Sequence, residues 1–103
     1  MPEKKNRYRA EVGMRLRLMR EALGLDQEEL ADILGVGANA VSQYEGGKRG
    51  IDPELAAKLK QAKAVTLDWI YAGDPSGLGE KLFKAATRPV AVRAAGASKR
   101  KVA

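Results

Sequence analysis

The stretch that decides the fold is "QEELADILGVGANAVSQYEG", which runs from Gln27 to Gly46. Asp26 before it and Glu29 within it form an aspartate version of the capping box, which begins a helix. Gly35 supplies a residue that tolerates positive φ, so a turn is expected there. A second short helix follows Gly37 and ends at Gly46. The stretch therefore predicts two short helices joined by a tight turn.

The same stretch holds the residues that two such helices need to pack together. Ala31 is small, as required where the helices cross, and the apolar positions at suitable offsets are Leu30, Leu34, Val36, Val41 and Tyr44. This pattern is typical of a helix-turn-helix, in which the second helix can enter the major groove of DNA.

The side chains on the other side of the second helix, 38–45, are short and uncharged, whereas a solvated helix face usually carries Lys, Glu and Arg. Asn39 and Gln43 each present a donor and an acceptor together, which matches N6 and N7 of adenine, and Ala38 can contact a thymine methyl group. These residues are therefore candidates for reading base edges. Taken alone, Asn39 and Gln43 can also be read as ordinary exposed polar residues.

The rest of the chain predicts further helices and no strands. A helix is expected from Glu11, and Asp52-Pro53-Glu54 begins another. Thr66 caps a last short helix that contains Trp69, expected in the core, and a further turn or two of helix can form over Glu80–Ala86. The apolar stripes expected to be buried are Val12, Leu16, Met19 and Leu23, then Leu30, Ala31, Ile33 and Leu34, then Leu55, Leu59 and Ala62. The expected fold class is all-α, a compact bundle of about five short helices.

The charge distribution divides the 103 residues into a near-neutral body and basic ends, with a net charge of +6. We expect a flexible basic N-terminal arm over residues 1–10, the folded domain over 11–73, a loop with a short helix over 74–86, and a disordered basic tail over 87–103. Basic ends favour a polyanionic partner, nucleic acid before membrane. The alternative is that these ends only keep a small protein soluble.

The absence of two residue types narrows the function. The chain has no cysteine and no histidine, which removes disulfides, thiolate metal sites, zinc fingers and the commonest general base. We therefore expect that the protein is not an enzyme and that it binds neither a cofactor nor a metal. No apolar run is long enough to span a membrane, and Arg15, Arg17 and Arg20 interrupt the first apolar stretch, so a secretory signal is not expected. The cytoplasm is the expected location.

Three segments in order carry a resemblance to a known family: "REALGLDQEELADILGV" (20–36), "AVSQYEGGKR" (40–49) and "VTLDWIYAGD" (65–74). The chain resembles the Cro/repressor-type helix-turn-helix domain of phage repressors and Xre-like bacterial regulators over about Val12 to Gly73. The resemblance implies a lambda-repressor-like DNA-binding domain. It also implies roles for single residues: base reading by Ala38, Asn39 and Gln43; DNA backbone contact by Gln27, Ser42, Lys48 and Arg49; and a structural ion pair between Arg20 and Glu45.

The expected function is that of a sequence-specific DNA-binding transcriptional regulator, a repressor of prophage type. Helix 38–45 would read the major groove of double-stranded DNA. A domain this small is expected to bind as a homodimer on a palindromic operator. The alternative is an antitoxin or adaptor module that uses the same fold to bind a partner protein, with the C-terminal region as the partner-binding segment.

Overall fold

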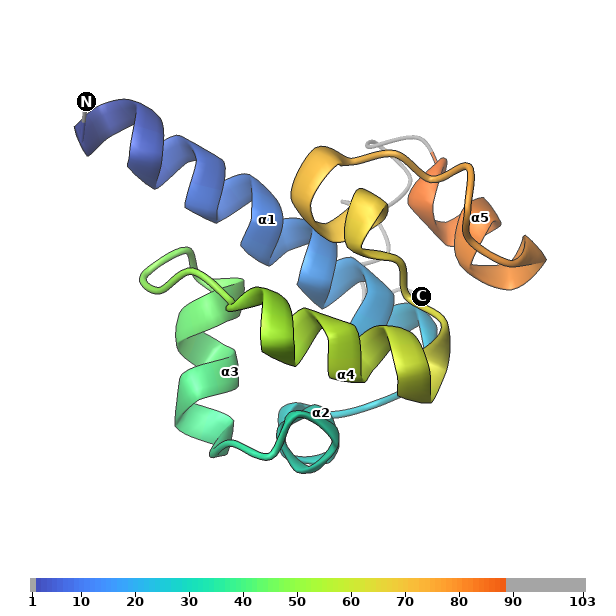
Figure 1. Cartoon of the computed structure of the whole chain (residues 1–103), viewed down its shortest axis with the longest axis horizontal. Coiled ribbons are helices and arrows are strands. Elements are labelled where there is room, and N and C mark those ends of the chain that lie inside the picture. The colour runs from blue at the N-terminus through green and yellow to red at the C-terminus, as the bar shows by residue number, and fades with distance from the viewer. Residues whose placement is uncertain (1, 89–103) are drawn as a thin grey trace, which may run out of the picture.

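The computed structural model describes residues 2–88, and these residues form helices without any strand. In chain order they are α1 (Pro2–Ala22), α2 (Gln27–Leu34), α3 (Ala38–Glu45), α4 (Pro53–Lys63), the short π-helix η1 (Asp68–Ala72) and α5 (Glu80–Ala86). In Figure 1, α3 stands at one end of the bundle and α5 at the other, while the N-terminal half of α1 projects beyond the loop that follows α3. The predicted all-α fold class is confirmed.

The ends of α2 follow the local signals in the sequence. Oδ1 of Asp26 accepts a hydrogen bond from the main-chain N–H of Glu29 at 2.8 Å, and Oε1 of Glu29 accepts one from the N–H of Asp26 at 2.8 Å. Gly35 closes the helix in the left-handed region with φ 75°, where a residue without Cβ is favoured. α3 begins at Gly37 without a side-chain cap. These caps set the turn of the helix-turn-helix.

One core joins all the elements. Its fully or nearly buried apolar side chains are Val12, Leu16, Met19, Leu30, Ala31, Leu34, Val41, Tyr44, Ile51, Ala56, Leu59, Val65, Trp69, Ile70, Leu78 and Leu82. Most residues of the predicted apolar stripes belong to this core, and Leu23, Ile33 and Leu55 are half-buried at its edge. The prediction for Ala62 is wrong, because the whole last turn of α4 is exposed. Ala64 ends that helix at φ 61°, and Val65 returns the chain to the core instead.

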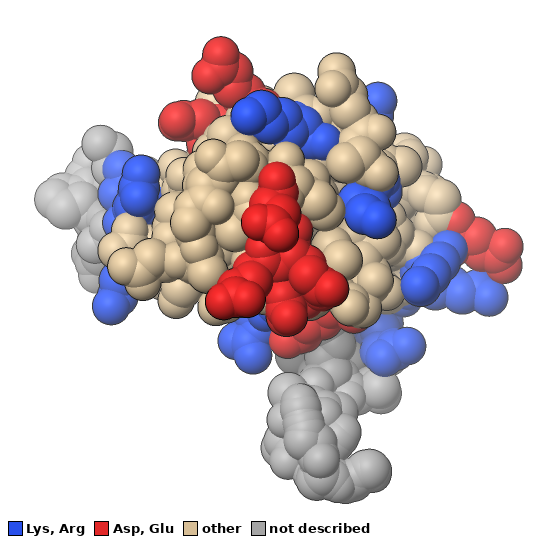
Figure 2. Space-filling model, turned by 90° about the horizontal axis from the view of Figure 1, so that it is seen from below, with Lys and Arg blue, Asp and Glu red and all other residues tan. Residues whose placement is uncertain are grey.

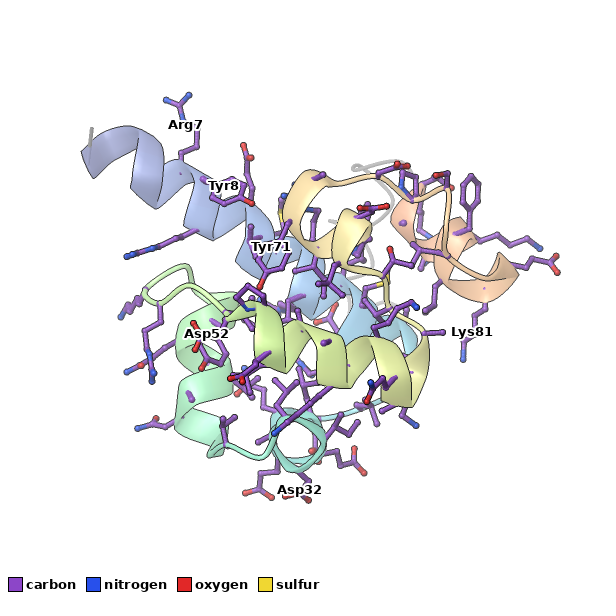
Figure 3. All side chains as sticks on the ribbon, in the orientation of Figure 1. Arg7, Tyr8, Asp32, Asp52, Tyr71 and Lys81 are labelled. Atoms are coloured by element: carbon purple, nitrogen blue, oxygen red, sulfur yellow. The ribbon has the colours of Figure 1, made fainter. Side chains whose placement is uncertain are left out.

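The first helix is longer than the sequence predicted, which corrects the expected flexible arm over residues 1–10. It begins at Pro2, a residue favoured in the first turn, rather than at Glu11. Contacts from distant parts of the chain hold the extension. The hydroxyl of Tyr8 donates to the carbonyl oxygen of Tyr71 at 2.8 Å, and Figure 3 shows the two side chains near each other. Gly47 lies directly against the backbone of Ala10.

The C-terminal part of the chain divides into a described and an undescribed segment. α5 forms at the predicted residues and packs on α1, with Leu82 buried. Residues 89–103, most of the predicted tail 87–103, lie outside the described residues.

α3 crosses α1 at a point where no side chain separates the two backbones. A Cβ placed on Gly13 would lie 2.6 Å from the carbonyl oxygen of Glu45 and closer still to that of Tyr44. Real Cβ atoms do not approach that near, so only glycine permits this crossing. The second helix of the motif therefore rests on the backbone of α1.

Candidate nucleic-acid interface

The outward face of α3 contains the four residues of this helix that were expected to contact DNA, which are Ala38, Asn39, Ser42 and Gln43. Asn39 and Ser42 are exposed, and Ala38 and Gln43 are half-buried. They lie three and four residues apart, so they share one side of the helix. Val41 and Tyr44, on the other side, are buried in the core. The structure thus brings the candidate base-reading residues together on a low, uncharged surface.

The loop after α3 folds back onto the end of that helix. The main-chain N–H groups of Lys48 and Arg49 both point at the carbonyl oxygen of Gln43, at 2.9 and 3.3 Å. The guanidinium of Arg49 lies 5.3 Å from the centre of the Tyr44 ring, and its Nη1 donates to Oε1 of Gln43 at 3.4 Å. Gly47 makes the turn with φ 77°. The backbone of Lys48 and the side chain of Arg49 are therefore held beside the amide-bearing face.

A third cation, Arg9 on α1, adjoins the same loop. A Cβ placed on Gly50 would lie 3.7 Å from Nε of Arg9, so this guanidinium stands next to Gly50, the residue that follows Lys48 and Arg49. We refer to Arg9, Lys48 and Arg49 as the loop-side cations. Figure 1 shows α3, its loop and the N-terminal half of α1 at the same end of the bundle. Arg9 could not be singled out from the sequence as a site residue, because residues 1–10 were expected to form a flexible basic arm.

Behind α3, Arg20 and Glu45 form an ion pair that links α1 to α3. Nε of Arg20 lies 2.6 Å from Oε2 of Glu45, Nη2 donates to Oε1 at 3.1 Å, and Nη1 donates to the carbonyl oxygen of Leu25 at 2.9 Å. The side chains are only 12% and 5% exposed. The hydrogen bond to Glu45 raises the pKa of Arg20 above its usual value, against the opposing effect of burial.

Gln27 joins this pair rather than standing free at the start of α2. Its Nε2 donates to Oε1 of Glu45 at 3.1 Å, and the side chain is half-buried. One N–H of the amide expected to contact a phosphate is therefore engaged within the protein. Gln27 ties α2 to the same carboxylate that holds α1 and α3, so the three helices share one polar junction.

The exposed side of α2 is acidic. Glu28, Glu29 and Asp32 are all exposed, and Figure 2 shows acidic side chains gathered across the middle of the lower face. Asp32 points away from the body of the protein in Figure 3. A polyanion is repelled by this face and attracted by the loop-side cations. The charge pattern thus favours an approach along α3 and its loop.

The described part of the chain offers neither a metal site nor a membrane span. Among the described side chains, residues 7–88, no group of three or more acidic residues is placed to hold a metal ion. No helix in that part of the chain is long and apolar enough to cross a membrane.

Three features define a helix-turn-helix protein: the capped helix α2, the glycine turn at Gly35, and the outward, amide-bearing face of α3. The helix-turn-helix family profile matches residues 16–70, and the chain belongs to this family, of the Cro/repressor type that the sequence resembled. No solved structure matches it.

Curated relatives carry regulator names. An uncharacterized transcriptional regulator in the ATPase CF(0) region of Rhodospirillum rubrum is 39% identical over 70 residues, which cover 64% of this chain and 65% of that protein. Uncharacterized HTH-type transcriptional regulators of Sinorhizobium medicae and Rhizobium meliloti are each 28% identical over 88 residues, covering 82% of this chain and 63% of theirs. The chain thus spans less than two thirds of the length of these relatives.

Proposed function

We propose that the protein is a sequence-specific DNA-binding transcriptional regulator, a repressor of the phage-repressor kind, that places α3 in the major groove. The observation that carries this proposal is the outward face of α3: its side chains are short, uncharged and partly amides, and it lies beside Lys48 and Arg49, whose backbone is bonded to Gln43. Small side chains let a helix sit deep in the groove, and amides can read base edges. The regulator names of the relatives support the same class of function.

The residues divide between two tasks. Asn39 and Gln43 read base edges, and Ala38 contacts a thymine methyl group. Ser42, which is exposed on the same face, contacts the DNA backbone together with the loop-side cations. Gln27 contributes to the backbone contact from the start of α2 through the part of its amide that Glu45 leaves free.

The working form is a homodimer on a palindromic operator in the cytoplasm. One recognition helix of eight residues reads only a few base pairs, so two copies on half-sites one helical turn apart supply the length of a specific site. In this arrangement the acidic side chains of α2 have to point away from the DNA, because they repel its phosphates. The alternative antitoxin or adaptor function depends on the C-terminal region, of which residues 89–103 lie outside the described residues; the names of the relatives favour DNA regulation.

The test is selection of bound duplexes from a random DNA pool at increasing salt. We expect one enriched, two-fold symmetric sequence. Gln43→Ala relaxes the preference at one base pair in each half-site, because a base-edge contact is lost. Lys48→Ala weakens binding to all sequences alike and reduces the salt slope by about 1, because one phosphate contact is lost.

Lys63→Ala is the matched control, since it removes an exposed cation at the end of α4 remote from α3. It should leave both affinity and preference unchanged. Binding without any enriched sequence, lost at moderate salt by all variants in the same way, would contradict the proposal.

A further inference from the structure

The candidate reading residue Gln43 is held by the loop through both of its carbonyl groups. The main-chain carbonyl oxygen accepts from the N–H groups of Lys48 and Arg49. The side-chain Oε1 accepts from Nη1 of Arg49 at 3.4 Å. The guanidinium that makes this contact is itself placed by the buried ring of Tyr44, 5.3 Å away. The carboxamide of Gln43 is therefore oriented before any DNA arrives.

This orientation changes what the amide can read. A free glutamine recognises adenine by donating to N7 and accepting from the N6 amino group. In this protein one lone pair of Oε1 is taken, and a positive guanidinium stands beside the oxygen. The N–H groups of Gln43 and the remaining N–H groups of Arg49 then form a unit made mostly of donors. Guanine presents two acceptors, N7 and O6, in the major groove and suits such a unit better than adenine.

We propose that Arg49 is a specificity-determining residue: it holds the side-chain carbonyl of Gln43 and so shifts the preference at the facing base pair from adenine to guanine. This inference rests on the proposed DNA-reading function of α3. It assigns Arg49 a role beyond attraction of the DNA backbone.

The neighbouring cation provides the contrast. Lys48 is exposed and shares the main-chain contact to Gln43, but its side chain makes no hydrogen bond or ion pair within residues 7–88, the range whose side chains are described. It can attract phosphate without orienting the amide. Arg49 has the planar, multiple-donor group that can stack on a ring and hold a carbonyl at once, and lysine lacks it.

The experiment is selection from a random duplex pool with the wild type, Arg49→Lys, Arg49→Ala and Lys48→Ala, each checked for an unchanged melting temperature. Arg49→Lys keeps the positive charge but loses the guanidinium, which stacks on Tyr44 and donates a hydrogen bond to Oε1 of Gln43. We expect the wild type to enrich guanine at one base pair of each half-site. Both Arg49 variants should shift the guanine-to-adenine ratio there by about tenfold toward adenine, the size expected for one bidentate contact.

The charge and orientation effects separate in the salt dependence. Arg49→Lys should keep the wild-type salt slope while its base preference changes, whereas Lys48→Ala should lower the slope and keep the preference. If both Arg49 variants keep the wild-type base preference, the inference is overturned and Arg49 is a backbone contact alone. If the wild type enriches no sequence at all, the proposed function is contradicted, and this inference, which rests on it, is contradicted as well.

A second readout needs no DNA. The side-chain amide resonances of Gln43 should shift in Arg49→Lys and Arg49→Ala and stay in place in Lys48→Ala. Unchanged amide resonances in the Arg49 variants would show that the contact does not orient Gln43 in solution, and this would also overturn the inference.

Discussion

Replacing Arg20 by methionine should destabilise the protein far more than a surface change, because it leaves a buried carboxylate behind. Glu45 is 5% exposed and accepts two hydrogen bonds from Arg20 and one from Gln27. Without the guanidinium, only the Gln27 amide remains to satisfy the charge. Breaking a buried pair from one side costs about 3–5 kcal/mol. This is a large share of the roughly 5–15 kcal/mol by which small proteins are stable.

The design that isolates the pair is a double-mutant cycle with Arg20→Met, Glu45→Met and the double variant. Removing both charges leaves neither buried and unpaired, so the double variant should be within about 2 kcal/mol of the wild type. The two single losses should therefore exceed the double loss, with a coupling of at least about 2 kcal/mol.

Urea unfolding followed by circular dichroism gives the free energies, and the emission of the sole tryptophan, Trp69, gives a second probe from the core. Because the pair is nearly buried, the coupling should persist in 1 M NaCl, where exposed pairs are screened. Single losses below about 1 kcal/mol, or losses that simply add in the double variant, would refute the reasoning.

Three further outcomes follow from the geometry. Gly13→Ala should lower the free energy of unfolding, measured in urea, by at least about 2 kcal/mol, because the added Cβ meets main-chain carbonyls of α3. The control is Gly79→Ala, whose Cβ would have nothing within 4 Å and which should change that free energy by less than about 1 kcal/mol. Burial raises the pKa of Tyr71 to about 12, so the folded state keeps this proton to higher pH than the unfolded state, and stability should fall between about pH 10 and pH 12. Tyrosinate absorbance should show this late titration and lose it in Tyr71→Phe. Arg9→Ala should lower the DNA-binding salt slope by about 0.9 while leaving base preference alone; a slope unchanged, as in Lys63→Ala, would remove Arg9 from the interface.

The sequence was sufficient where a signal and its effect lie within a few residues of each other. The capping box of Asp26 and Glu29 needs only the helix that it begins, and the turn at Gly35 needs only its own φ. The outward face of α3 could also be predicted, because helical spacing alone separates Asn39 and Gln43 from Val41.

The sequence was insufficient where the cause lies far along the chain. The extension of α1 to Pro2 depends on contacts of Tyr8 with Tyr71 and of Ala10 with Gly47, which no local pattern reveals. The need for glycine at residue 13 comes from the carbonyls of α3, more than thirty residues later. Similarly, the hold of Arg49 on Gln43 depends on how the loop folds back, and neither residue type signals it.

The backbone contact at Gly13 has a consequence for how this protein can diversify. The position of α3 is set from behind, by a glycine, a buried ion pair and core side chains, and none of these belongs to its outward face. Residues 39 and 42 can therefore be exchanged without moving the helix that carries them. Under the proposed function, base preference and folding stability therefore depend on separate sets of residues, so that a new target sequence would need few substitutions and no change in the scaffold.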